Sequence, residues 1–328
     1  MKALTSLVLV TACALAGCAT EPSKSDMGRT RAALSESGAR VVAFGEGAMS
    51  LGYMPAVPER AALGAPSFAR AASGETLVLD ALKSRVVKVA ADGTLSEVTK
   101  VDRDAVDLAV ADDGAFAVKR GGAPKVVVYG PDGARLGELS FAILQDVERI
   151  ALLPSRRVVA ISAHQERYVL GSPTFPSRDA EVLHSKAEGV VSRKDGAGVS
   201  LVREADGSLV LVSTAKGASD ERAHEVSRVT FGKGDAARIV GASGDVVCMR
   251  VEHAGAAQGA EITVDREAVC ADATTGAVTF RAPLGAPGLY VPHRELSFER
   301  GVLTFARPET TKSGAALSIT TFAVSEKK

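Results

Sequence analysis

Short runs of β-branched and other apolar residues, separated by Asp-Gly pairs, recur along most of this chain. Three pairs of segments match at an offset of 40 residues: 74–79 with 114–119, 86–89 with 126–129, and 92–93 with 132–133. Looser copies of the first of these runs lie at 157–161, 207–212, 244–248 and 301–305. An Asp-Gly pair between two apolar runs indicates a tight turn between antiparallel strands. The pattern therefore predicts repeated blades of four antiparallel strands, in which each of these runs is a second strand.

Six such copies fit the length of the repeated region. Residues 40–324 allow about 48 residues per copy, a usual blade length once loop insertions are counted. We therefore expect an all-β fold, a six-bladed β-propeller of four-stranded antiparallel blades. Its ring would close where 40–44 pairs with strands of the final blade within 302–324, because closure hides edge strands. A pair of β-sandwiches and a seven-bladed ring are the alternatives.

Two parts of the repeat carry a family resemblance. The segment 64–93 resembles the repeats of NHL and six-bladed TolB-like propellers, and 269–278 is similar to the strand-turn-strand unit of quinoprotein-like propellers. Blades three and four have diverged from this pattern, and a proline-containing insertion occupies 171–186. The resemblance implies the propeller fold over most of the chain.

The first residues have the features of an export signal. Met1 and Lys2 precede an uncharged run over 3–16, which is too short for a permanent transmembrane helix. The run ends in Leu15-Ala16-Gly17-Cys18, which resembles the lipobox of bacterial lipoproteins. The resemblance implies cleavage before Cys18 and a three-chain lipid anchor on that cysteine, and more than one chain is what stable membrane attachment requires. The alternative is an ordinary signal cleaved near Ala16 or Ala19.

These features predict the domain organisation and the location. We expect a signal peptide at 1–17, the lipidated Cys18 and a flexible polar tether at 18–39, the propeller at 40–324 and a tail at 325–328. Position 19 is alanine, and not the aspartate that resembles an inner-membrane retention signal in enteric bacteria. We therefore expect an outer-membrane lipoprotein, at the periplasmic face rather than at the cell surface.

Two of the four cysteines remain once Cys13 leaves with the signal and Cys18 carries lipid. Cys248 and Cys270 lie in strand-like runs joined by a Gly/Ala-rich loop, which predicts a hairpin with the cysteines roughly opposite each other. In an oxidising compartment we expect a disulfide between them. Two buried free thiols are the alternative, whereas a zinc site would be only half built from two sulfurs.

Charge and composition exclude several functions. The chain has 39 Lys and Arg residues against 39 Asp and Glu residues, with no basic stripe, which argues against a nucleic-acid partner. It contains no Trp and no Asn. The calcium-dependent lactonases of the six-bladed class use Asn ligands, and quinoprotein dehydrogenases stack their cofactor on Trp. These absences, and the lack of P-loop, Gly-x-Ser-x-Gly and HExxH motifs, lead us to expect no cofactor and no resident metal.

Candidate site residues are few. The carboxylates of Asp102, Asp104 and Asp107 are the densest acidic cluster, which suits either a calcium site or, more simply, a solvated loop between blades. Phe175 lies between two prolines in the insertion and is a candidate contact residue, or else packs over blade three. The five histidines are 20 to 40 residues apart, a spacing that a ring could bring together around a metal as in NHL lyases; they are His164, His184, His224, His253 and His293. Isolated structural histidines are the other interpretation.

The function that these observations favour is a non-catalytic outer-membrane lipoprotein whose propeller binds a partner protein or an envelope polymer. Asp102, Asp104 and Phe175 are its candidate binding residues. One alternative is an envelope lyase or hydrolase that uses histidine and carboxylate groups in the central channel. The other is a surface sensor of a ligand.

Overall fold

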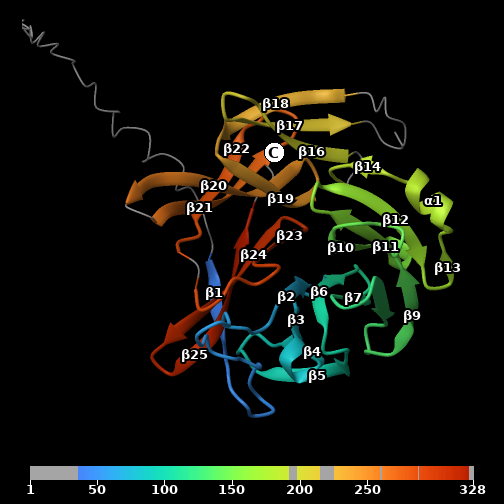
Figure 1. Ribbon diagram of the computed structural model, residues 1–328, viewed down its shortest axis with the longest axis vertical. Coiled ribbons are helices and arrows are strands. Elements are labelled where there is room, and N and C mark those ends of the chain that lie inside the picture. The colour runs from blue at the N-terminus through green and yellow to red at the C-terminus, as the bar shows by residue number, and fades with distance from the viewer. Residues whose placement is uncertain (1–35, 192–197, 215–224, 259–260, 287, 325–328) are drawn as a thin grey trace, which may run out of the picture. The chain divides into compact units, whose positions relative to one another are not determined.

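Six antiparallel sheets follow one another along the chain, and each is one blade of the ring in Figure 1. The computed structural model describes residues 36–191, 198–214, 225–258, 261–286 and 288–324. They belong to one compact unit, Leu34–Lys328. The expected signal peptide, Cys18 and most of the expected tether lie outside the described residues. The expectation of an all-β, six-bladed propeller with four-stranded blades is confirmed.

The blades share one order of strands, from the channel outwards. The first strands are β2 (Ser67–Arg70), β6 (Ala105–Val110), β10 (Val147–Leu153), β15 (Val190–Val191), β19 (Ala236–Ser243) and β23 (Leu296–Glu299). The second strands are β3 (Thr76–Asp80), β7 (Phe116–Arg120), β11 (Arg157–Ser162), β16 (Gly198–Arg203), β20 (Val246–Gln258) and β24 (Val302–Thr311). The third strands are β4 (Arg85–Val89), β8 (Lys125–Tyr129), β12 (Glu166–Ser172), β17 (Ser208–Thr214), β21 (Glu261–Asp272) and β25 (Gly314–Ala323). The fourth strands are β5 (Leu95–Lys100), β9 (Arg135–Ser140), β13 (Phe175–Pro176), β18 (Glu225–Lys233), β22 (Val278–Pro283) and β1 (Glu36–Ala43).

One strand differs in rank from the sequence expectation. The run at 207–212, taken as a second strand, belongs to β17, the third strand of blade four. The turn before it, Asp206-Gly207, has the same chemistry as the turns before the second strands of other blades, so turn residues alone could not distinguish the two ranks.

The insertion at 171–186 replaces a regular fourth strand in blade three. Two short strands, β13 and β14 (Ala187–Glu188), pair with different parts of β12. The helix α1 (Asp179–His184) lies between them. Two 3₁₀ turns, η1 (Ala81–Lys83) and η2 (Pro154–Arg156), complete the helical elements of the described residues, none of which is long and apolar enough to cross a membrane.

The ring closes between the two ends of the propeller, as the sequence predicts. β1 pairs antiparallel with β25 and forms the outer strand of the last blade. Val42 of β1 pairs with Leu317 of β25, and both side chains are buried. The first segment of the propeller therefore covers the outer edge of its last blade.

Asp-Gly turns join the outer strands in a recurring way. In the turn after β4, Asp92 Oδ1 accepts a hydrogen bond from the Thr94 backbone N–H at 2.9 Å, and Gly93 has a φ of 84°. A Cβ atom on Gly93 would lie 2.7 Å from the carbonyl oxygen of Val41. Glycine is required there both by the positive φ and by the close approach of blade six.

The core lies between neighbouring blades. Five apolar clusters fill such interfaces, and each combines side chains from the facing sheets of two blades. In the cluster between blades five and six, Cys248 of β20 and Cys270 of β21 are paired in register and joined by a disulfide. The predicted hairpin and its disulfide are thus confirmed.

Candidate functional site

The carboxylate of Asp107, on β6, lies at the centre of the ring and is completely buried. Ser67 Oγ donates a hydrogen bond to its Oδ1 at 2.8 Å, and the Ile150 backbone N–H donates to its Oδ2 at 2.9 Å. Ser67 precedes Asp107 by 40 residues, the offset of the sequence repeat, so both occupy equivalent places on neighbouring first strands. Asp107 thereby joins blades one, two and three.

Arg294, in the connection before β23, supplies the counter-charge. Its Nε donates to Asp107 Oδ1 at 2.9 Å and its Nη2 donates to Oδ2 at 2.8 Å. The same Nη2 donates to the carbonyl oxygen of Ile150 at 2.9 Å, and the Arg294 backbone N–H donates to that of Pro66 at 3.0 Å. One residue next to blade six is therefore bonded to blade two, blade three and the segment that leads into blade one.

The charge state of Asp107 follows from these contacts. Burial alone would raise the pKa of its carboxyl group. The charge and hydrogen bonds of Arg294, with smaller contributions from His293 and the Ile150 N–H, outweigh burial and hold that pKa below its ordinary value. Asp107 is thus ionised at neutral pH, and its lone pairs are engaged by four hydrogen bonds. This carboxylate stabilises the ring and is not poised to exchange a proton.

Arg149, on β10, is a second buried cation in the channel. Its side chain crosses to blade five, where Nη2 donates to the carbonyl oxygen of Ile239 at 2.9 Å. Its Nε is buried and has no hydrogen-bond partner among the described residues. Burial, together with the nearby cations Arg238 and Arg294, lowers the pKa of Arg149 to about 9. Unlike Arg294, it forms no ion pair with any carboxylate in the described part of the chain.

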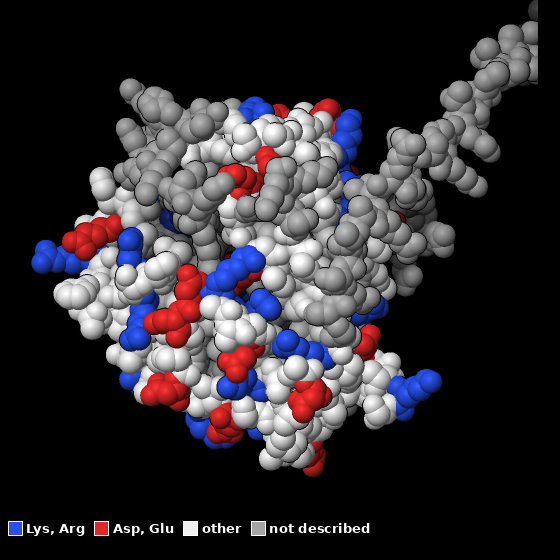
Figure 2. Space-filling model, turned by 180° about the vertical axis from the view of Figure 1, so that it is seen from behind, with Lys and Arg blue, Asp and Glu red and all other residues white. Residues whose placement is uncertain are grey.

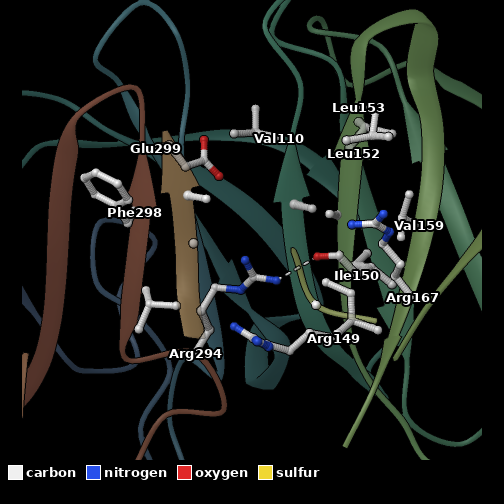
Figure 3. Close-up of a pocket in the computed structure, with 17 residues that line it drawn as sticks. Val110, Arg149, Ile150, Leu152, Leu153, Val159, Arg167, Arg294, Phe298 and Glu299 are labelled. Atoms are coloured by element: carbon white, nitrogen blue, oxygen red, sulfur yellow. Dashed lines mark hydrogen bonds between the residues drawn. The ribbon is translucent and has the colours of Figure 1, made fainter. Parts of the chain in front are cut away.

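A cavity of about 100 Å³ lies in the channel beside these groups (Figure 3). Its walls come from blades two, three, five and six and are largely apolar; they include Val110, Ile150, Leu152, Val159, Val240 and Phe298. Its charged lining residues are Arg149, Arg167, Arg294 and Glu299. An apolar pocket with a few convergent charged groups is the usual form of a small-molecule site.

Arg167 reaches this cavity from β12. Figure 3 shows its guanidinium beside Val159, inside the cavity. Its Nη1 is buried without a hydrogen-bond partner in the described residues, and burial lowers the pKa of the group. A Cβ atom on Gly198 would lie 3.2 Å from Nη1, so the glycine leaves room for the guanidinium.

A second, smaller cavity of about 30 Å³ adjoins the first. Arg149 and Arg294 line both cavities. Other cations in the wall of the smaller cavity are held in ion pairs: Arg238 with Glu148, and Arg250 with both Glu252 and Glu295. Its volume is roughly that of one water molecule.

The acidic cluster of the sequence is divided in the structure. Asp102 and Asp104 both pair with Arg120, and Asp104 also accepts the Gly122 backbone N–H at 3.0 Å. Asp107 points away from them into the channel. The expectation of a solvated loop is therefore wrong for Asp107, because the residue begins the buried part of a first strand rather than ending the loop. A role of Asp102 and Asp104 in binding stays a prediction.

The histidines are dispersed. His164 and His184 are exposed on blade three, and His253 pairs with Glu267 on blade five. His293 lines the smaller cavity, and its Nε2 lies 2.8 Å from the carbonyl oxygen of Glu148. His224 lies outside the described residues. The four described histidines do not converge on one site, so the structure does not assemble from them the metal centre that a lyase of this kind would need.

Phe175 lies far from the channel. It is on β13, at the outer edge of blade three, and its side chain is 81% exposed. The alternative that it packs over blade three is excluded by this exposure. On the face shown in Figure 2, basic and acidic side chains are intermixed, and neither sign forms a continuous stripe on the described part of that face.

Sequence reasoning missed Arg149, Arg167 and Arg294. For Arg149 a signal was present, since it lies in a first strand directly before an apolar run, and Asp107 likewise lies within a first strand. A charged residue within such a run faces either solvent or the channel. Arg294 lies in an irregular connection, and Arg167 lies near the start of a third strand, where no pattern marks them.

Comparison with known proteins finds distant structural likenesses and no match in sequence. No protein-family model matches the chain, and no curated protein matches it in sequence. Among solved structures, a streptogramin B lyase is 12% identical, with 83% of this chain and 98% of that chain covered and a TM-score of 0.42. Virginiamycin B lyase from Staphylococcus aureus is 11% identical, with 83% and 99% covered and a TM-score of 0.41. The β-propeller domain of Cps50 (Swd1) from Myceliophteria thermophila is 11% identical, with 80% and 96% covered and a TM-score of 0.41. At such values these proteins carry no argument about activity or ligand.

Proposed function

We propose that this protein is a non-catalytic lipoprotein of the bacterial outer membrane, tethered through Cys18 and facing the periplasm, whose propeller binds a partner protein or an envelope polymer. The lipobox-like sequence Leu15-Ala16-Gly17-Cys18 supports the anchor. The NHL/TolB-like repeat pattern supports a propeller of the kind that presents loops and edges to partners.

The observation that carries the proposal is the exposure of Phe175. β13 pairs with the end of β12, and the Phe175 backbone N–H donates to Ser172 Oγ at 3.2 Å, so the backbone beneath the ring is fixed. Next to it, Pro173 packs on Gly137 of blade two, where a Cβ atom would lie 2.9 Å from the Pro173 Cβ. Aromatic residues, phenylalanine among them, are enriched in the buried part of protein interfaces, which supports Phe175 as a contact for a partner.

The alternative of a lyase or hydrolase in the channel has less support. The carboxylate nearest the centre, Asp107, is engaged by four hydrogen bonds, and the described histidines do not converge. A surface ligand sensor would carry its propeller on the outside of the cell, whereas our proposal places the propeller in the periplasm. Protease digestion of intact cells would remove a sensor's propeller, and we expect the propeller to be protected.

Crosslinking in intact cells, followed by affinity capture, tests the binding function. We expect an envelope component to be recovered in stoichiometric amount with the native chain and to be lost or strongly reduced with Phe175→Ser. Met49→Ser is the matched control, because Met49 is also an exposed apolar residue and lies in the connection between β1 and β2, away from β13 in the sequence. Equal recovery with Phe175→Ser and the native chain would contradict the role of this surface.

The anchor is tested separately. We expect Cys18→Ser to abolish lipid labelling and to move the protein from the membrane fraction to the soluble fraction. Labelling that persists in Cys18→Ser would contradict the assignment of Cys18.

A further inference from the structure

We propose that the central cavity binds a small carboxylate that carries a short apolar tail. The carboxylate would lie on Arg167, and the tail along Leu152 and Val159, which lie on the same side of the cavity as Arg167 in Figure 3. This inference goes beyond the proposed function, because it holds whether or not the chain is lipidated or bound to a partner.

The first support comes from buried donors without acceptors. Arg149 Nε and Arg167 Nη1 are both buried and lack a hydrogen-bond partner among the described residues. Each side chain lines the same cavity. A buried cationic donor without an acceptor is costly, so a ligand that supplies an acceptor is favoured there. Figure 3 shows the guanidinium group of Arg167 apart from that of Arg149 and on the same side of the cavity as Leu152 and Val159, so Arg167 is the donor that a small ligand with a short tail would reach.

The second support is the charge balance around the cavity. Three guanidinium groups line it, those of Arg149, Arg167 and Arg294. Asp107, bonded to Arg294, and Glu299 supply two negative charges. The lining of the cavity therefore carries more positive than negative charge, which favours an anionic ligand such as a carboxylate. Figure 3 shows Glu299 across the cavity from Arg167, so that the acidic side chain does not occupy the position of the ligand carboxylate.

The third support is the size and polarity of the remaining space. A cavity of about 100 Å³ has room for about three water molecules or for a molecule somewhat smaller than benzene. Leu152, Val159 and Phe298 are almost completely buried around it. An inorganic phosphate would place some of its oxygens against these apolar side chains, where those oxygens would have no hydrogen-bond donors. A short aliphatic tail fits the same walls.

The test uses the purified full-length protein in detergent and three probes: propionate, its uncharged analogue propionamide, and inorganic phosphate. Isothermal titration calorimetry should give a dissociation constant for propionate on the order of 1 mM or tighter. We expect propionamide and phosphate to bind at least tenfold more weakly. No binding of propionate, or equal binding of propionamide, would overturn the proposal. Phosphate binding as tight as that of propionate would overturn the apolar half of the site.

Variants separate the guanidinium group from the tail pocket. Arg167→Met should weaken propionate binding at least tenfold, whereas Arg157→Met, a change to an exposed arginine of the same blade, should leave it unchanged. Because Arg167 has no acidic partner in the described chain, its loss should not lower the melting temperature, which is measured in parallel. Val159→Leu keeps the guanidinium group of Arg167 and fills the tail space, so it should weaken the binding of propionate more than that of acetate. Unchanged propionate binding in Arg167→Met, or equal losses of acetate and propionate binding in Val159→Leu, would overturn the assignment.

Discussion

Asp107 and Arg294 are 187 residues apart in the sequence and form two hydrogen bonds to each other, of 2.9 Å and 2.8 Å, at the centre of the ring. The pair connects blade two with the segment that leads into blade six. Because Asp107 also accepts from blades one and three, four of the six blades meet at this one carboxylate. We therefore regard the pair as the main polar contact that holds the blades around the channel.

The first prediction concerns this pair. Asp107→Asn leaves the Arg294 guanidinium group buried without a counter-charge, and Arg294→Met leaves the Asp107 carboxylate buried without one. Each substitution should lower the free energy of unfolding by about 3–5 kcal/mol. The double variant should lose less than the sum, by about 1–3 kcal/mol, because neither charge is then left alone. Urea unfolding of the four proteins measures this coupling. Asp104→Asn is the control, and should have a much smaller effect because water screens its pair with Arg120. Strictly additive losses would show that the two residues act independently.

The second prediction is the acid dependence of stability. The pKa of Asp107 is held below its ordinary value in the folded protein, so the unfolded chain takes up a proton at this residue at a higher pH than the folded one. The stabilisation by Asp107 is thus fully present above the unfolded pKa of about 3.9 and is lost as the pH falls below it. The difference in unfolding midpoint between the native chain and Asp107→Asn should therefore narrow between pH 5 and pH 3. A difference that is constant over this range would contradict the ion pair.

The repeat pattern of the sequence predicted the blades because their turns depend on local chemistry. Closure followed from the general need to hide edge strands, and the disulfide from two cysteines on one predicted hairpin. Asp92-Gly93 and its copies specify turns through a side-chain hydrogen bond and a positive φ, both of which are readable from two residues. The channel was not predictable in the same way. Which side chains meet there depends on how far each first strand is shifted along the channel, and Arg294 enters from an irregular connection. Asp107 was noticed only as part of an acidic cluster, and its true neighbours lie 40 and 187 residues away.

The third prediction concerns the disulfide between Cys248 and Cys270, which closes a loop of 22 residues. Replacing both cysteines by alanine should lower the free energy of unfolding by about 3 kcal/mol, because the unfolded chain gains the entropy that the crosslink removes. Reductant should destabilise the native chain and leave the double variant unaffected. Alkylation of unreduced, unfolded protein that labels either cysteine would show free thiols instead.

The fourth prediction tests closure of the ring, with two neighbouring residues of β1 that face opposite sides. Val42 is 1% exposed and packs in the cluster between blades one and six, whereas Val41 is 46% exposed. Val42→Asp would bury a carboxylate among apolar side chains, which should cost at least about 3 kcal/mol and detach β1 from β25. Val41→Asp keeps the same backbone pairing and should change stability by only about 0.5 kcal/mol. Hydrogen exchange at the β25 amides that pair with β1 distinguishes the two, because only Val42→Asp should leave that edge unpaired and fast to exchange. If both variants kept β25 protected and equally stable, closure would depend on the backbone ladder alone and not on the side chain that β1 places in the core.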